Sequence, residues 1–332
     1  MYVAKCEISI GSGKTAFRFN RVTAAEIRKS TQLLVDTALI RLPTTALMKD
    51  VKASTTVEVA NEVKVGMPVS IRLWYQGGEN QAITFLGYVK RVNRKTPVEI
   101  ECEDAIGLLR QKNLCKDWKD TTLETILQEI VNGTGITLAA GIPAISLKTF
   151  YLKNVNGMEA LQRIRDEFGL SVYMNASNEL YCGLAYRENY GQATYCLNGD
   201  SANIVQADRL QWQEKSDVRV CVKAIGVKAD NSCIAVTVGD QGGALSVLRF
   251  YNIESEGELK ALANQELSKL QFEGYRGKIT AFLIPGVFPG MVAEIKDEKY
   301  PLRQGHYFIE SVRTAFGTDG CRNEVELGTK VV

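Results

Sequence analysis

The chemistry that the sequence offers most openly is phosphate binding, in the stretch ISIGSGKTAF at residues 8–17. Its Gly-Ser-Gly-Lys-Thr resembles the end of the G-x-x-x-x-G-K-[ST] loop, whose backbone amides close around phosphates between a buried strand and a helix. Here Ile8 stands where the first glycine is needed, and the residues after Lys14 alternate as in a strand. The alternation on both sides predicts a β-hairpin with the glycines in its turn, so we expect no nucleotide at Lys14. A nucleotide-binding enzyme that uses GSGKT is the alternative.

Other catalytic or metal chemistry has little material in this chain. His306 is the single histidine, so any Ser-His-Asp or Cys-His apparatus must be built on it, and a lone histidine at a strand end is usually structural. No C-x-x-C pair occurs, which argues against zinc and for reduced thiols in a protein folded in a cytoplasm. The sequence predicts no catalytic residue, no cofactor and no metal. The eight cysteines are Cys6, Cys102, Cys115, Cys182, Cys196, Cys221, Cys233 and Cys321.

Composition indicates an ordinary globular protein. The chain has 332 residues, of which 45% are hydrophobic and 23% charged, and this length suggests two or three domains. No apolar run approaches the roughly 20 residues of a membrane span, and no secretory signal precedes the first strand pattern, so we expect no membrane anchoring. The net charge of +2 gives no general attraction to nucleic acid.

Residues 1–117 are predicted to form a first β domain. After the hairpin, Thr23-Ala24-Ala25-Glu26 has the form of a capping box and predicts a short helix to about Ser30. Many short strands with turn residues between them favour a barrel or sandwich. The predicted strands are Asp36–Leu42, Thr55–Ala60, Val69–Tyr75, Ala82–Val92 and Val98–Glu103.

Residues 118–199 are predicted to form a small α/β module. Thr121–Glu124 and Asn156–Glu159 are capping boxes, each followed by apolar residues on one helical face, and Gly133 and Gly169 suit the helix ends. The segment from Leu170 to Leu184 is typical of a hairpin.

Residues 200–332 return to a β pattern and are predicted to form a second β domain, interrupted by one helix at Glu256–Phe272. The predicted strands are Val218–Val227, Ser232–Val238, Leu245–Tyr251, Gly277–Leu283, Met291–Ile295, Tyr307–Thr314 and Glu324–Leu327.

A repeat connects the two β regions. Gly66-Met67-Pro68-Val69-Ser70-Ile71 and Gly290-Met291-Val292-Ala293-Glu294-Ile295 each open a strand with a glycine turn. A charged stretch, an aromatic-bearing strand and a closing strand follow in both, ending in VEIE and EVEL. Three elements in the same order favour duplication, and two unrelated β domains that share common hairpins are the alternative.

These stretches resemble a known family. FLGYVKRV and VEIECEDAIGLLRQKN (residues 85–113) resemble the first barrel of baseplate hub proteins from contractile-tailed phages. The segment TTLETILQEIVNGTGI with VNGMEALQRIRDEFGLSVYMNASNELYCG resembles the inserted α/β region of that family. VFPGMVAEI with GHYFIESVRTAFGTDGCRNEVELG resembles the end of its second barrel.

The resemblance implies a mainly β fold in which two similar, tail-tube-like β-barrel domains flank the α/β module. It implies a non-enzymatic virion protein of the baseplate, assembled in the bacterial host cytoplasm, that forms a homotrimer between the hexameric tail tube protein and a trimeric central spike. Related hubs begin the spike proteins of contractile secretion systems. Because the chain ends at Val332 soon after the second barrel, we expect a separate spike protein. A carbohydrate-binding β protein is a further alternative, although it would carry a secretion signal.

One basic cluster is a candidate contact site. Lys90, Arg91, Arg94 and Lys95 crowd the turn between two strands of the first β domain. Charged turns are common as solvated loops. The functional alternative places these cations where DNA passes through the ring or where an acidic partner docks.

Overall fold

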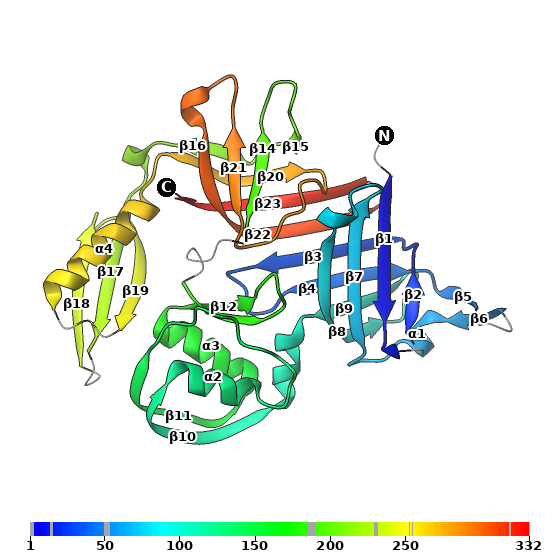
Figure 1. Ribbon diagram of the computed structural model, residues 1–332, viewed down its shortest axis with the longest axis horizontal. Coiled ribbons are helices and arrows are strands. Elements are labelled where there is room, and N and C mark those ends of the chain that lie inside the picture. Colours follow the sequence, from blue (N-terminus) through cyan, green and yellow to red (C-terminus); the bar gives the residue numbers. More distant parts are fainter. Residues whose placement is uncertain are drawn as a thin grey trace.

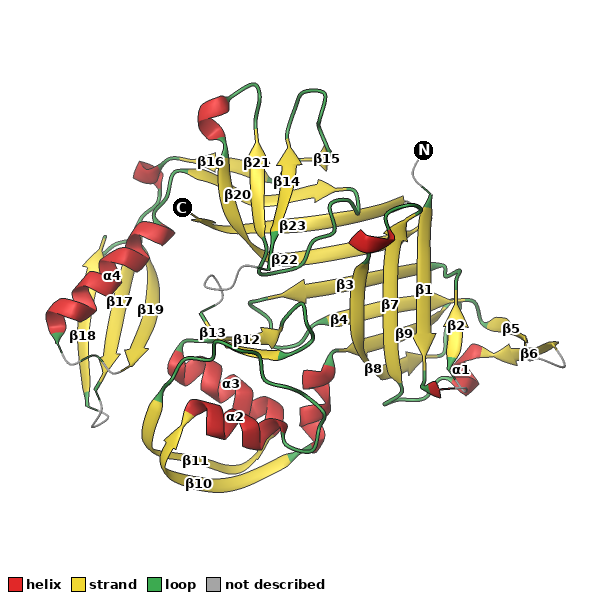
Figure 2. Cartoon of the chain, viewed as in Figure 1, coloured by secondary structure: helices red, strands yellow, loops and turns green. Residues whose placement is uncertain are grey.

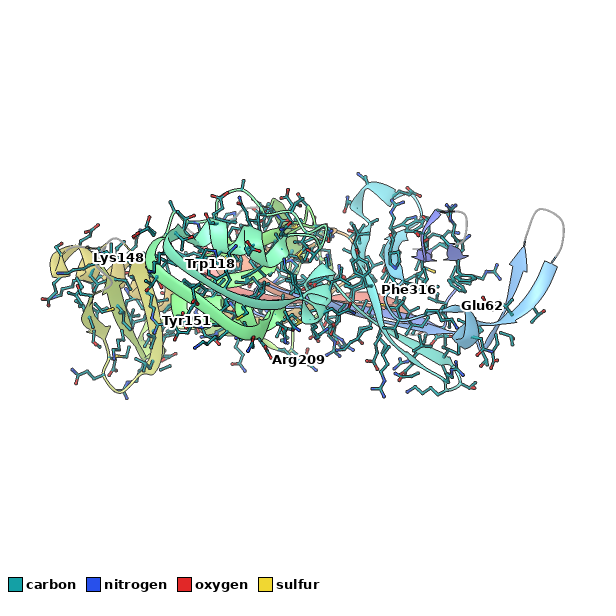
Figure 3. The ribbon with its side chains drawn as sticks, turned by 90° about the horizontal axis from the view of Figure 1, so that it is seen from below. Glu62, Trp118, Lys148, Tyr151, Arg209 and Phe316 are labelled. Atoms are coloured by element: carbon teal, nitrogen blue, oxygen red, sulfur yellow. The ribbon has the colours of Figure 1, made fainter. Side chains whose placement is uncertain are left out.

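The computed structural model describes residues 3–13, 16–49, 54–184, 190–228, 232–251, 253, 255–318 and 320–331. It shows a mainly β protein in which an α/β module lies between two β domains along the chain (Figures 1 and 2), which confirms the predicted fold class. Seen from below, the molecule is long and thin, with β5 and β6 at one end (Figure 3).

The first β domain contains most of the predicted strands. The hairpin of β1 and β2 is confirmed, with Ile8 opposite Phe19 and Ile10 opposite Phe17, so a strand follows the glycines where a P-loop needs a helix. Lys14 and Thr15 lie outside the described residues. The elements are β1 (Ala4–Ile10), β2 (Phe17–Phe19), β3 (Ala24–Ser30), β4 (Thr37–Leu42), β5 (Thr45–Lys49), β6 (Ser54–Glu58), α1 (Val59–Glu62), β7 (Pro68–Tyr75), η2 (Glu79–Gln81), β8 (Ile83–Asn93) and β9 (Val98–Glu103).

The helix predicted from Thr23 to Ser30 is wrong, because this segment is strand β3. Ala25 and Ile27 are buried while the residues beside them are more exposed, which is the period of a strand. β3 is hydrogen-bonded to β4 on one side and to β22 on the other. Pairing on both edges outweighs the local capping signal, and Glu26 binds arginines instead of capping a helix.

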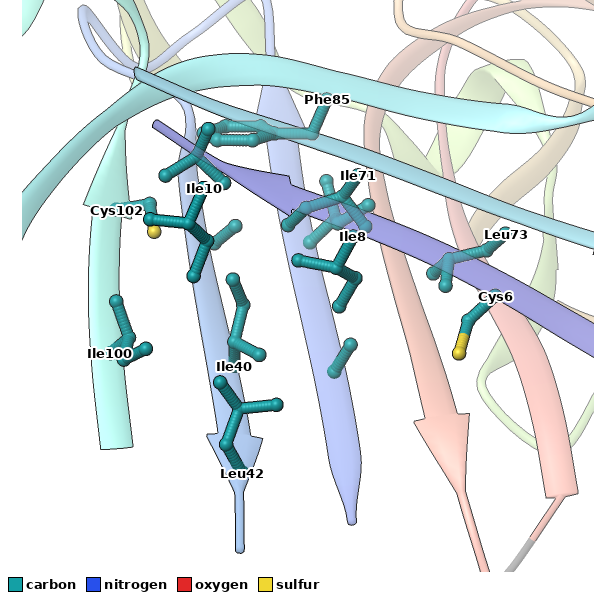
Figure 4. Close-up of a cluster of buried hydrophobic side chains, with 14 of the residues drawn as sticks. Cys6, Ile8, Ile10, Ile40, Leu42, Ile71, Leu73, Phe85, Ile100 and Cys102 are labelled. Carbon is teal, nitrogen blue, oxygen red and sulfur yellow. The ribbon is translucent and has the colours of Figure 1, made fainter. Parts of the chain in front are cut away.

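The core of the first domain lies between two layers of strands. Ile40 and Ile100 point from β4 and β9 toward Ile8 and Ile71 of β1 and β7, and Phe85 of β8 closes one side (Figure 4). Each of these side chains is at most 1% exposed. The alternation seen in the sequence therefore corresponds to a real division of each strand into a buried and an outward face.

The α/β module has its own core beside the first domain. Asn156 and Glu159 form the predicted capping box of α3, and Gly169 ends that helix with φ 65°. The N-cap of α2 is Thr122, one residue later than predicted. The core includes Ile106 and Leu114, which precede residue 118, so we propose that the module starts near residue 105. The elements are η3 (Ala105–Gln111), β10 (Asn113–Thr122), α2 (Leu123–Val131), β11 (Ser146–Asn156), α3 (Gly157–Phe168), β12 (Ser171–Met174) and β13 (Leu180–Gly183).

The second β domain carries an insertion of its own. A three-stranded sheet and helix α4 form a separate core at one end of the molecule (Figure 1). This insertion consists of η5 (Lys215–Asp217), β17 (Val220–Val227), β18 (Cys233–Gly239), β19 (Ala244–Tyr251) and α4 (Glu256–Leu270). The domain itself consists of β14 (Gln192–Cys196), β15 (Ile204–Gln206), β16 (Leu210–Gln213), β20 (Gly274–Ala281), β21 (Val292–Lys296), η6 (Pro301–Arg303), β22 (Gly305–Gly317) and β23 (Gly320–Val331).

The repeat extends to atomic detail. Gly66 N donates to Val89 O and Val89 N to Met67 O, both at 2.8 Å. The second domain repeats both bonds at 2.9 Å, from Gly290 N to Ile309 O and from Ile309 N to Met291 O. β7, β8 and β9 thus correspond to β21, β22 and β23.

The strands outside these three also recur, because β4 pairs with β9 as β20 pairs with β23. β3 pairs with β4 as β16 pairs with β20. One difference stands out: β1 is antiparallel to β7, whereas β14 is parallel to β21. The two domains share one sheet, since β22 pairs with β3 over seven residues from Ser311 to Gly317.

The two repeat glycines offer a matched test. Both have positive φ, 84° at Gly66 and 92° at Gly290, a region that costs an L-residue about 1–2 kcal/mol. A Cβ at Gly66 would meet open space, whereas one at Gly290 would lie 2.6 Å from the Tyr190 ring. We expect Gly66→Ala to lower the free energy of unfolding by about 1–2 kcal/mol and Gly290→Ala by clearly more. Urea titration of both variants measures this, and equal losses would contradict it.

Candidate interaction surfaces

The central sheet has one outward face that carries charges from both domains. On each strand the apolar residues point into the cores and the alternate residues point outward. We call these outward residues the polar face. They are Glu26, Arg28, Arg41, Glu99, Glu101, Lys278, Arg313, Glu324 and Glu326.

Ion pairs run along the polar face, both within and between strands. Glu26 of β3 binds Arg28 at 2.5 Å and Arg313 of β22 at 2.7 Å, so one carboxylate connects the two domains. In the second domain, Glu324 binds Arg209 at 3.1 Å and Lys278 at 3.6 Å. Exposed ion pairs of this kind each contribute little to stability. Their main effect is that positive and negative side chains lie next to one another across the polar face.

Glu99 on β9 belongs to the same pattern. It binds Arg41 at 2.9 Å and Lys95 at 2.7 Å. Hydrogen bonds from Lys95 and Arg41 lower the pKa of the Glu99 carboxyl. This carboxylate is therefore charged at neutral pH and offsets one of the cations in the basic turn.

Glu103 anchors the other end of the predicted basic cluster. Its carboxylate binds Lys90 at 2.5 Å and also Arg110, which lies in η3 at the start of the module. Burial alone would raise the pKa of Glu103, but the hydrogen bonds from Arg110 and Lys90 outweigh it, and the pKa is lowered. The three side chains thus tie the edge of the first domain to the module.

The four predicted contact residues lie together, but not all in the turn. Lys90 and Arg91 belong to strand β8, whereas Arg94 and Lys95 lie in the connection to β9. All four are exposed, and two of them are in ion pairs with glutamates of β9. Their contact with DNA or with a partner stays a prediction.

Sequence reasoning missed the carboxylates around these cations. The signal was present in VEIECE, where the glutamates at positions 99, 101 and 103 alternate with buried Val98, Ile100 and Cys102. That alternation was used only to predict a strand. The outward residues of a strand are as regular as its core residues.

Catalytic and metal groups are scattered in the part of the chain that the structure describes. His306 is exposed on β22, opposite Glu294 of β21 and Val331 of β23. Within the described residues no cysteine is bonded to another cysteine, and burial raises the pKa of the Cys102 thiol to about 12. Within the described ranges no three His, Cys, Asp or Glu side chains gather as a metal site would need. Within the same ranges, the helices are too short or too polar to cross a bilayer.

Comparison with known proteins finds similar solved structures but no related sequence. No family model matches the sequence, and no curated protein matches it. The structure is similar to the tail protein from Neisseria meningitidis MC58, with a TM-score of 0.61, 14% identity and coverage of 99% of this chain and 97% of that one. It is equally similar to the 43 kDa tail protein of prophage MuSo2 from Shewanella oneidensis, with a TM-score of 0.62, 14% identity and 98% coverage of both chains.

A third similar structure comes from a bacterial secretion system. It is an Escherichia coli component of the type VI secretion system, described as structurally similar to the T4 tail proteins gp27 and gp5. The TM-score is 0.55 at 11% identity, and the match covers 93% of this chain and 73% of that one. Near-complete coverage by tail proteins shows that this chain has the fold of phage tail proteins, which a type VI secretion component shares.

Proposed function

We propose that this protein is a structural baseplate hub of a phage tail or a related injection apparatus. In this role three copies form a ring that joins a hexameric tail tube to a trimeric central spike. The chain acts by assembly and not by catalysis. It would reside in the tail of the particle, after assembly in the bacterial host cytoplasm.

The observation that carries this proposal is the internal repeat. Each chain presents two β domains with the same strand order and the same glycine-turn hydrogen bonds. Three such chains offer six nearly equivalent units, and each unit can meet one subunit of a hexameric tube. The spike side of the ring sees three identical chains, so one protein resolves the mismatch between the two symmetries.

The polar face suits the inner wall of such a ring. It is continuous across both domains because β3 and β22 are paired, and its carboxylates and cations neutralise one another over short distances. A wall with this charge pattern presents no strong field to a polyanion that passes through it. In this arrangement, the part of the inner wall that the first domain forms has a basic cluster near one rim, made of Lys90, Arg91, Arg94 and Lys95.

Mass measurement and imaging test the proposal. A chain of 36.7 kDa predicts a trimer of about 110 kDa, that is, three times 36.7 kDa. Light scattering after size exclusion, over a range of concentrations and with purified tube protein added, should detect this mass. Negative-stain images should show a central opening. A different closed oligomer, or a monomer that tube protein does not assemble, would contradict the hub.

A further inference from the structure

The contact between the two β domains of one chain is a template for contacts between chains. Inside the chain, strand β3 of the first domain pairs with the second half of β22, from Ser30 opposite Ser311 to Ala24 opposite Gly317. The junction begins with Thr31, whose N–H donates to Glu310 O at 3.0 Å. It is reinforced by the ion pair of Arg313 with Glu26.

The strands that correspond to this junction have open edges in the described residues, one on β16 and one on the part of β8 that extends beyond its pairing with β7. β16 holds the position of β3, and within the described residues it pairs only with β20. β8 holds the position of β22, and its residues after Tyr88 pair with β9 on one side, while no described strand lies on the other. Unpaired strand edges of this kind favour pairing with another chain.

We propose that these two edges bind each other between neighbouring copies of this chain, β8 of one copy against β16 of the next. The inference rests on the hub proposed above and deepens it by assigning the subunit interface. The contact joins different surfaces of the two copies, so it is heterologous and closes a ring when the rotation per copy is one third of a turn.

The register on β8 follows from the shared hydrogen bonds. Because Val89 and Ile309 make the same bonds to their glycine turns, they are equivalent. The next residue, Lys90 in β8 and Glu310 in β22, lies in each case in a break of the register with the following strand. Arg91 therefore corresponds to Ser311 and Asn93 to Arg313.

The register on β16 follows from the strands behind it. Leu210 faces Gly277, which faces Leu327 of β23. Ile27 faces Ala38, which in turn faces Cys102 of β9. Leu327 is opposite Ile309 and Cys102 is opposite Val89, so Leu210 corresponds to Ile27 and Gln213 to Ser30.

Combining the two registers gives specific pairs across the interface. Arg91 is placed opposite Gln213, Val92 opposite Trp212, and Asn93 opposite Gln211. The apolar pair suits burial, since Val92 and Trp212 are both half-buried already. Glu214 corresponds to Thr31 and Lys90 to Glu310, so the contact at the start of the junction is made between chains by Glu214 and Lys90. These two exposed residues have opposite charge.

This interface is shorter than its template. β8 ends at Asn93, the counterpart of Arg313, whereas β22 continues for four residues, to Gly317. Three paired residues and one junction give less binding than the seven pairs inside the chain. We therefore expect the ring to form at higher protein concentration or on its tube partner, and to come apart before the chain unfolds.

Disulfide trapping tests the register in the full-length protein. The parent variant carries Cys115→Ser and Cys233→Ser, because those two thiols are exposed. Asn93→Cys and Gln211→Cys are then added together, since directly opposed strand residues lie within disulfide range. Mild oxidation at the concentration where light scattering detects the oligomer should give dimers and trimers on a non-reducing gel.

Three controls sharpen the result. Each single cysteine variant should give at least tenfold less cross-linked product. Arg28→Cys with Arg313→Cys should bond within the chain, which titration of free thiols detects, without raising the mass on the gel. Glu214→Lys, added to the trapping pair, should lower the yield of cross-linked product severalfold, because it places a second cation beside Lys90. Adding Lys90→Glu to that variant restores opposite charges across the interface and should recover part of the yield.

The outcomes separate this inference from the hub itself. A trimer by mass that gives no ladder overturns the assigned interface and leaves the hub in place. A protein that stays monomeric with tube protein present, and gives no ladder, overturns both. A ladder that ends at the trimer supports both.

Discussion

Replacing Asp104 with alanine is expected to lower the free energy of unfolding by roughly 2–6 kcal/mol. Asp104 is 2% exposed and lies where β9 ends and the α/β module begins. Its carboxylate accepts from Asp36 N at 2.7 Å and from Ile106 N at 2.9 Å. Alanine leaves both buried donors without a partner, and each such loss costs about 1–3 kcal/mol.

Chemical denaturation of Asp104→Ala near pH 4 measures this loss, because repulsion between the buried carboxyls, whose pKa values are raised, is weak there and does not offset it. Asp117→Ala is the matched control on the neighbouring strand β10. Asp117 is exposed, so its replacement should change the free energy of unfolding by no more than about 0.5 kcal/mol. Asp104→Asn keeps one acceptor and should fall between the two. A loss below 1 kcal/mol for Asp104→Ala would show that water satisfies the two donors.

Replacing Asp36 with asparagine is expected to stabilise the protein above pH 6 and to have little effect near pH 4. Burial raises the pKa of the Asp36 carboxyl to about 6, and Lys29 and the Ser30 N–H oppose this rise. Burial and the charge of Asp36 also raise the pKa of Asp104. The folded chain thus holds these protons more tightly than the unfolded chain, so their stabilising effect is present below pH 4 and is lost as the pH rises through 6.

Asparagine keeps an oxygen for the Ser30 N–H, which Asp36 Oδ1 accepts at 3.0 Å, and it carries no charge. The gain at pH 8 should be about 2–3 kcal/mol relative to the natural chain. Denaturation from pH 4 to 8 gives the free energy of unfolding of the natural chain and of Asp36→Asn, and the difference between the two values at each pH checks the prediction. Glutamates such as Glu99, whose pKa is lowered, contribute equally to both proteins and cancel in this difference. A constant difference across this range would refute the account.

Sequence patterns were sufficient for elements whose signal is local. The capping box at Asn156 and the glycine at 169 specify α3 by contacts within a few residues, and the structure contains them as expected. The hairpin at Gly11–Gly13 was predictable for the same reason. The repeat was visible because a turn glycine, Gly66 or Gly290, lies two residues before each of the strands β7 and β21.

Elements defined by distant partners were not predictable. Ala24–Ser30 has a helix start signal, and only its two neighbours in the sheet make it a strand. The parallel pairing of β14 with β21 joins residues about a hundred positions apart and leaves no local trace. The polar face could be expected strand by strand, but the ion pair of Glu26 with Arg313 required the fold.

Strand β22 has a mechanical consequence. It is a single 13-residue strand bonded to β21, β23 and β3, so it crosses the boundary between the two domains as one continuous strand, whose register with β23 breaks on either side of Ile309. A hinge between them would need a flexible linker, whereas bending here must strain a ladder of backbone hydrogen bonds together. Each chain therefore behaves as a stiff plate. In the ring proposed above, the more compliant contacts would be those between chains, and a mechanical load on the ring would concentrate there.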